Sequence, residues 1–114
     1  MIIDCHGHYT TEPKLFTDWR AAQLKMVEDG DYRPSRDELV IGDDEIRESI
    51  ENNQRRLQIE RGADVTIISP RAGGMGHHLG TAETSVEWTQ LSNDMIARIV
   101  GLFPKNFIGV CALP

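Results

Sequence analysis

The chain has 114 residues, a formal net charge of −6 at pH 7 and 39% hydrophobic residues. This length suits one domain with its own core, so we treat residues 1–114 as a single region. The negative charge argues against a nucleic-acid partner, because phosphate backbones bind basic surfaces. Apolar runs are too short for a membrane span, and Asp4 and His6 interrupt the N-terminal one, so we expect no membrane segment and no signal peptide.

The two cysteines, Cys5 and Cys111, lie in apolar, strand-like runs at opposite ends of the sequence. This placement predicts buried free thiols rather than a disulfide. Free thiols are typical of a reducing compartment, so we expect a cytoplasmic protein.

The opening stretch, Met1-Ile-Ile-Asp-Cys-His-Gly-His8, carries two histidines directly after an apolar run. If residues 1–5 form a strand, His6 and His8 lie on the same side of it, because side chains alternate along a strand. Neutral imidazoles are good ligands for zinc and similar metals, and Gly7 has no Cβ, so backbone and metal can approach closely. The pair predicts half of a metal site; alone, such pairs also occur on solvated strands.

The first half of the remaining chain predicts two helices joined by a loop. A helix over residues 13–28 follows from apolar residues at spacings of four, three and four, namely Leu15, Trp19, Ala22 and Met26. Residues 28–44 contain turn formers and predict a long surface loop, which is either a lid or merely solvated. A second helix starts at a cap on Asp43 or Asp44 and ends at Arg61; one face comprises Ile46, Ile50, Asn53 and Leu57.

The second half predicts strand, helix and strand. Residues 63–69 are β-branched and apolar, as a buried strand requires. Thr84-Ser-Val-Glu87 has the pattern of a capping box, and it precedes a helix over about 85–102 with a periodic face of Trp88, Leu91, Met95, Ile99 and Leu102. Residues 107–113 predict a third strand. Apolar strands separated by helices indicate parallel strands with right-handed crossovers, an α/β fold.

The glycine-rich loop over residues 70–80 follows the second strand and is a candidate binding loop. Arg71 can bind a carboxylate through its planar guanidinium, and a salt bridge to a loop acid is the alternative. His77 or His78 can hydrogen-bond a substrate or move a proton, and a plain polar loop is the alternative. The glycines match neither G-x-x-x-x-G-K nor G-x-G-x-x-G, which excludes a nucleotide site of those types.

Histidines at the carboxyl end of a parallel strand lie where a (β/α)₈ barrel carries its chemistry. Three parallel strands leave apolar edges unpaired, and two histidines cannot complete a tetrahedral metal shell. We therefore expect residues 1–114 to form the N-terminal portion of a (β/α)₈ TIM barrel, with later strands supplying the other ligands.

The opening stretch resembles the first strand of the metal-dependent amidohydrolase superfamily, which ends in His-x-His. Within it, residues 6–10, 60–64, 69–72 and 102–110 closely resemble the family of 4-oxalomesaconate hydratases, across the whole chain but only about the first third of those enzymes. The resemblance implies a distorted barrel with one catalytic zinc ion, of which His6 and His8 are two ligands. Other divalent metals fit two imidazoles almost equally well, so the choice of zinc depends on the resemblance.

The implied reaction adds water to the carbon–carbon double bond of 4-oxalomesaconate, giving 4-carboxy-4-hydroxy-2-oxoadipate in bacterial breakdown of protocatechuate and gallate. The partner is a small tricarboxylate, so Arg71 would bind a substrate carboxylate, and His78 and His77 would bind substrate or assist proton transfer. We also expect a homo-oligomer.

Two alternatives stay open. One is a zinc-dependent non-oxidative decarboxylase of an aromatic or muconate-type acid from the same superfamily. The other is a non-catalytic fragment or interaction module, if the chain ends at Pro114. For the hydratase too, we expect the isolated 114 residues not to turn over substrate, because the later ligands and the general acid/base are missing.

Overall fold

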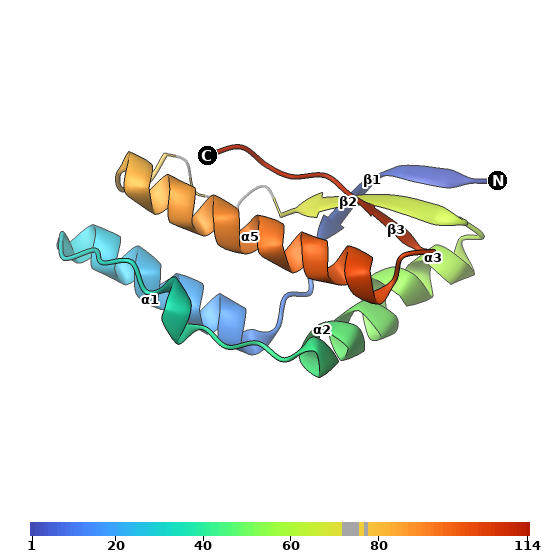
Figure 1. The fold of residues 1–114 in the computed structure, drawn as a ribbon, viewed down its shortest axis with the longest axis horizontal. Coiled ribbons are helices and arrows are strands. Elements are labelled where there is room, and N and C mark those ends of the chain that lie inside the picture. The colour runs from blue at the N-terminus through green and yellow to red at the C-terminus, as the bar shows by residue number, and fades with distance from the viewer. Residues whose placement is uncertain (72–75, 77) are drawn as a thin grey trace.

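A computed structural model describes residues 1–71, 76 and 78–114 of the chain. Its sheet has three parallel strands in the order β1 (Ile3–Tyr9), β2 (Val65–Pro70) and β3 (Phe107–Gly109). The helices are α1 (Lys14–Asp29), the consecutive segments α2 (Asp43–Ile50), η2 (Glu51–Arg55) and α3 (Arg56–Glu60), and α5 (Ala82–Leu102), with a 3₁₀ turn, η1 (Arg36–Glu38), between α1 and α2. Parallel strands alternating with helices confirm the predicted α/β fold (Figure 1).

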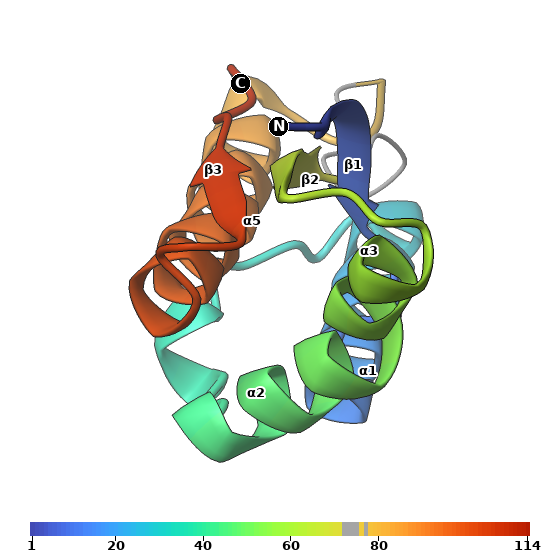
Figure 2. The same ribbon diagram turned by 90° about the vertical axis from the view of Figure 1, so that its right-hand side faces the viewer.

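The helices gather on one side of the sheet, as both ribbon views show (Figures 1 and 2). On β2, Thr66 and Ile68 are buried, and Ile68 is fully enclosed in the core with residues of α2 and α5. Side chains alternate along the neighbouring strands, so other apolar side chains lie outside this core. Ile3 is 50% exposed and Ile108 is 52% exposed. The described helices include none that is long and apolar enough to span a membrane.

The prediction that both cysteines are buried is wrong. Cys5 and Cys111 are free, and both are exposed. Cys5 lies on an edge strand of a sheet that helices cover on one face only. Cys111 lies beyond the end of β3. The next residue, Ala112, forms its backbone hydrogen bonds with the side-chain amide of Asn93 in α5, which donates to the Ala112 C=O and accepts from the Ala112 N–H at 2.9 Å each. The third strand therefore ends at Gly109 and not at residue 113.

β1 is longer than predicted and contains both histidines. Its pairing with β2 steps from Asp4 opposite Thr66 to Gly7 opposite Ile68, so β1 carries one extra residue there. The carboxylate of Asp4 accepts a hydrogen bond from the backbone N–H of His6 at 3.1 Å, which supplies a partner to the residue at the bulge. Bulges redirect nearby side chains, and this one lies immediately before the histidine pair.

The helical run from Asp43 to Glu60 contains a π-helical segment, η2, which shifts its buried face by one residue. Ile46 and Ile50 are fully buried, as predicted. From η2 onward the face continues through Gln54, within η2, and the buried Gln58 of α3 rather than through Asn53 and Leu57. Leu57 is 36% exposed. A π-segment bonds i to i+5, so each turn takes up more residues than an α-turn and advances the pattern.

Helix starts and faces differ from the predictions where polar side chains make tertiary hydrogen bonds. In α1 the buried residues are Phe16 and Gln23, whereas Leu15 is 48% exposed. Gln23 can be buried because its amide donates a hydrogen bond to the Ser35 hydroxyl. The cap of α5 is Thr81, three residues before the predicted one. Glu87 does not cap this helix; its carboxylate accepts from the backbone N–H of Ser35 and of its neighbour at 2.8 Å each.

The start of α2 and the loop before it also depend on such contacts. α2 is capped at Gly42 rather than at an aspartate, and the Glu45 carboxylate accepts from the Gly42 N–H at 2.9 Å. Asp43 instead pairs with Arg98 of α5. The loop over residues 30–42 is bonded to α1 and α5 through Ser35, so the structure favours a packed loop over a lid.

Candidate metal centre

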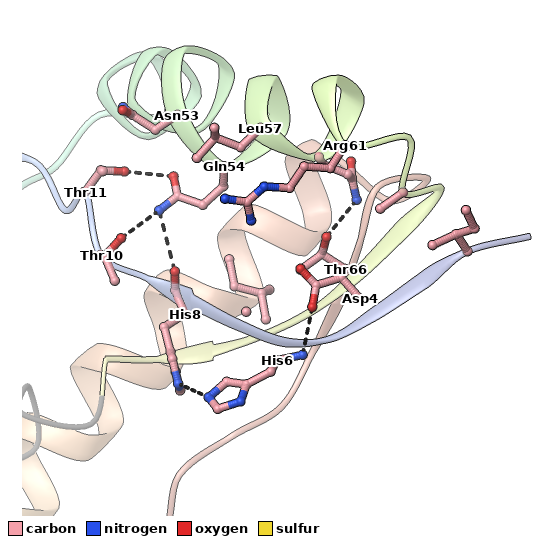
Figure 3. Close-up of a pocket in the computed structure, with 15 residues that line it drawn as sticks. Asp4, His6, His8, Thr10, Thr11, Asn53, Gln54, Leu57, Arg61 and Thr66 are labelled. Atoms are coloured by element: carbon pink, nitrogen blue, oxygen red, sulfur yellow. Dashed lines mark hydrogen bonds between the residues drawn. The ribbon is translucent and has the colours of Figure 1, made fainter.

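The two histidines of β1 meet through the ring nitrogens that a metal would use. Their Nε2 atoms lie 3.0 Å apart, and the rings are edge-to-face with centroids 4.9 Å apart (Figure 3). Two imidazole ligands of one tetrahedral zinc ion, each at 2.0–2.1 Å, would place their nitrogens about 3.3 Å apart. The structure thus brings His6 and His8 together as the sequence predicts, with both Nε2 atoms converging on one point.

The other ring nitrogen of His8 is held by β2. His8 and Ser69 are partners in the β1–β2 register. The Nδ1 atom of His8 lies 2.8 Å from the Ser69 hydroxyl and 3.2 Å from the carbonyl oxygen of Pro70. A carbonyl oxygen only accepts, so this contact favours the neutral tautomer of His8 that carries its proton on Nδ1 and its lone pair on Nε2.

A polar network fixes the end of β1 from the helical side. The amide of Gln54, in the π-segment, donates to the His8 carbonyl at 3.5 Å and to the Thr10 hydroxyl at 3.3 Å. Its oxygen accepts from the Thr11 hydroxyl at 2.8 Å. Figure 3 shows Gln54 on one side of β1 and both imidazole rings on the other. The face shift at η2 is therefore what places an amide against the backbone of His8.

Gly7 serves the packing of the two strands. A Cβ built there would lie 2.5 Å from the Thr66 methyl and 2.9 Å from the Ile67 carbonyl oxygen. The missing Cβ, which was predicted to let a metal approach closely, instead allows the close approach of β2. A glycine is therefore required for β1 to pair with β2 at the point where the histidines project.

The donor set fits part of a zinc shell. Both histidines offer Nε2, and an imidazole whose Nδ1 contacts a carbonyl is the usual form of a metal ligand. Across the described residues no group of three or more histidine, cysteine, aspartate or glutamate side chains is placed to hold a metal ion. Asp4 is the nearest carboxylate in sequence, and it bonds the His6 backbone. Residues 1–71, 76 and 78–114 thus supply two ligands to such a site.

A cavity of about 520 Å³ lies beside β1, between this strand and the η2 and α3 segments. Its walls include Asp4, Gln54, Leu57 and Arg61 together with atoms of both histidines. The imidazole rings themselves extend away from Gln54 and Leu57 (Figure 3).

Arg71 lines a different cavity, of about 230 Å³, with Glu12 and Arg20. Burial raises the pKa of Glu12, while the charges of Arg71 and Arg20 act to lower it. Burial also lowers the pKa of Arg20, whose guanidinium lies 4.2 Å from the centre of the Trp88 ring. Two cations and one carboxylate line this cavity, so an anionic group entering it meets a net positive charge.

The two loop histidines, His77 and His78, have no role that the structure supports as it supports the pairing of His6 with His8. His78 is exposed, in the turn that precedes α5, and it lines neither of these two cavities. His77 lies outside the described residues. The structure therefore joins His6 to His8 but does not join Arg71 or His78 to that pair.

Sequence reasoning assigned no role to Ser69, Gln54 or Glu12. Ser69 could have been found from the sequence, because the carboxyl ends of neighbouring parallel strands meet at one edge of a sheet. Ser69 is the last residue but one of β2, as His8 is of β1. Gln54 could not have been found from the sequence, because only the π-segment turns its side chain toward the strand.

The fold and the histidine pair place the chain among α/β proteins with a candidate metal site on a parallel strand of the sheet. No family model matches the sequence. It is 54% identical, over all 114 residues, to 2-keto-4-carboxy-3-hexenedioate hydratase from a Sphingobium species, covering 33% of that protein. The crystal structure of 4-oxalomesaconate hydratase, LigJ, from Rhodopseudomonas palustris matches the whole chain with a TM-score of 0.87 and 45% identity, and 33% of that structure is covered. The chain is therefore homologous to 4-oxalomesaconate hydratase and spans about a third of the length of these relatives.

Proposed function

We propose that this chain forms the first part of a distorted (β/α)₈ barrel that catalyses the hydration of 4-oxalomesaconate to 4-carboxy-4-hydroxy-2-oxoadipate. Homology over the full chain to two hydratases supports the reaction class. The convergence of the His6 and His8 Nε2 atoms, 3.0 Å apart, is the structural observation that carries the proposal.

His6 and His8 would hold a zinc ion, with the remaining ligands supplied from outside the described residues. Bound there, zinc would act as a Lewis acid and stabilise the enolate-like charge that develops as water adds to the double bond. His8 keeps its Nε2 lone pair available through the Nδ1 contact with the Pro70 carbonyl. Water addition also needs a group to accept and return a proton, and we propose His78 and His77 as candidates for it.

Arg71 would bind one carboxylate of the tricarboxylate substrate. Its cavity supports this role because Arg20 adds a second positive charge and a single carboxylate, Glu12, opposes them. Replacing Arg71 by alanine is expected to raise KM several-fold or more while zinc remains bound, since the histidines line another cavity. An unchanged KM would remove Arg71 from the substrate site.

The deciding experiment mixes the native-length gene product with 4-oxalomesaconate and follows the near-ultraviolet absorbance of its conjugated double bond. The expected result is loss of this absorbance that a chelator abolishes, with no release of CO₂. Loss accompanied by CO₂ would indicate the decarboxylase alternative. A zinc-loaded protein that leaves the absorbance unchanged would reject the hydratase proposal.

A further inference from the structure

We propose that Ser69 is a positioning residue that sets the tautomer and ring orientation of His8, so that Nε2 is presented to a divalent metal. The inference rests on the proposed metal-binding function of His8. It concerns a residue outside the metal-binding pair itself, on the neighbouring strand.

The hydrogen-bond directions around Ser69 follow from its neighbours. Its hydroxyl lies 3.3 Å from the Gly7 carbonyl oxygen and 3.4 Å from the Pro70 carbonyl oxygen. Both of these atoms only accept, so the hydroxyl proton is directed to one of them. The lone pairs of the Ser69 oxygen then face Nδ1 of His8, at 2.8 Å, and accept a hydrogen bond from its N–H.

This arrangement selects one tautomer of His8. A hydroxyl free to rotate can either donate to Nδ1 or accept from it, and donation would leave the ring proton on Nε2, where it blocks the metal. When the hydroxyl proton is donated to the Gly7 or the Pro70 carbonyl, it is not available for donation to Nδ1. The Pro70 carbonyl, at 3.2 Å from Nδ1, favours the same tautomer but is the longer of the two contacts. Ser69 therefore makes the stronger contact.

The two histidines differ in how firmly they are held. His8 and Ser69 are both partly buried and paired across β1 and β2, whereas His6 is exposed. The ring of His6 contacts the Nε2 of His8. His8 is thus the more firmly oriented of the two residues that would hold a metal. Partners that orient a metal-ligating histidine typically contribute 10–100-fold to metal affinity, so we expect an effect of about this size.

The test uses the native-length gene product and the variants Ser69→Ala and Ser69→Thr. Long-range ¹H–¹⁵N correlation spectra of the metal-free proteins report which nitrogen of His8 carries the proton. Wild type is expected to show a single form, protonated on Nδ1. Ser69→Ala should show a mixture of tautomers, and Ser69→Thr, which restores the hydroxyl, should return the single form. A loss of packing alone would not move a tautomer ratio.

Titration with Co²⁺, followed by its visible absorption, gives the second readout. Ser69→Ala is expected to bind about 10–100-fold more weakly, with Ser69→Thr near wild type. Ser92→Ala, at a buried serine of α5, is the matched control and should alter neither readout. If Ser69→Ala leaves the tautomer and the Co²⁺ affinity unchanged, the positioning role of Ser69 is wrong, and the metal-binding proposal is unaffected. A wild-type protein that binds no Co²⁺ would overturn the metal-binding proposal and this inference with it.

Discussion

Replacing Gly7 by alanine tests whether the histidine-bearing strand depends on its close contact with β2. The new methyl group would lie 2.5 Å from the Thr66 methyl, about 1 Å inside the usual separation of two carbon atoms. It would also lie 2.9 Å from the backbone oxygen of Ile67, which cannot move without the central strand. Neither neighbour can yield without disturbing β2.

The size of the effect follows from these contacts. Thr66 cannot rotate freely, because its hydroxyl accepts a hydrogen bond from the Gln58 amide at 3.0 Å, and losing such a bond costs about 1 kcal/mol. Inserting a methyl group into a packed site costs about 1–3 kcal/mol. We therefore expect Gly7→Ala to lower the free energy of unfolding by about 2–4 kcal/mol.

Urea unfolding of the native-length gene product measures this change. With a slope of about 2 kcal/mol per M, the midpoint should fall by roughly 1–2 M. Gly101→Ala is the matched control, because a Cβ there meets nothing within 4 Å and the residue lies in α5. That variant should gain about 1 kcal/mol from the higher helix propensity of alanine. A Gly7→Ala midpoint equal to or above that of wild type would refute the strand-contact argument.

Three further predictions concern other parts of the fold. Glu87→Ala removes the acceptor for the N–H groups of Ser35 and Arg36, so hydrogen exchange at these two amides should accelerate at least tenfold; unchanged protection would contradict this. Burial raises the pKa of Glu12, so its contribution to stability is present below the unfolded pKa and is lost as pH rises through the native pKa. Glu12→Gln should therefore gain stability relative to wild type between about pH 4 and pH 7 in urea unfolding, whereas a difference independent of pH would contradict the shift. Ile50→Ala, at a side chain with 0% exposure, should cost about 2–5 kcal/mol in the same assay, and a cost below 1 kcal/mol would place this residue outside the core.

The sequence predicted the order of strands and helices because apolar periodicity is strong in α5 and in β2. It failed where polar side chains take part in tertiary contacts. Thr81 and Thr84 both fit a helix cap, and the choice between them depends on Glu87, which bonds the distant Ser35 N–H. A buried glutamine such as Gln23 is equally invisible to a search for apolar stripes.

For the candidate site, residue type and spacing were enough to predict that His6 and His8 lie together, because alternation along a strand determines their side. Their partners depend on strand register and on helix geometry, which local patterns do not encode. Ser69 reaches His8 through the β1–β2 register, and Gln54 reaches it through η2. The substrate roles proposed for Arg71 and His78 stay predictions.

The extra residue within η2 has a consequence for comparing this chain with its relatives. A related helix that lacks the π-segment would be one residue shorter between the strand-facing positions, so residue 53 rather than Gln54 would correspond to its inner face. A gapless alignment across residues 51–55 would then equate side chains that point in different directions from there to Gln58. Placing the gap inside η2 keeps both halves of the helix in structural correspondence, and it marks the relatives in which an amide can reach the backbone of the second histidine.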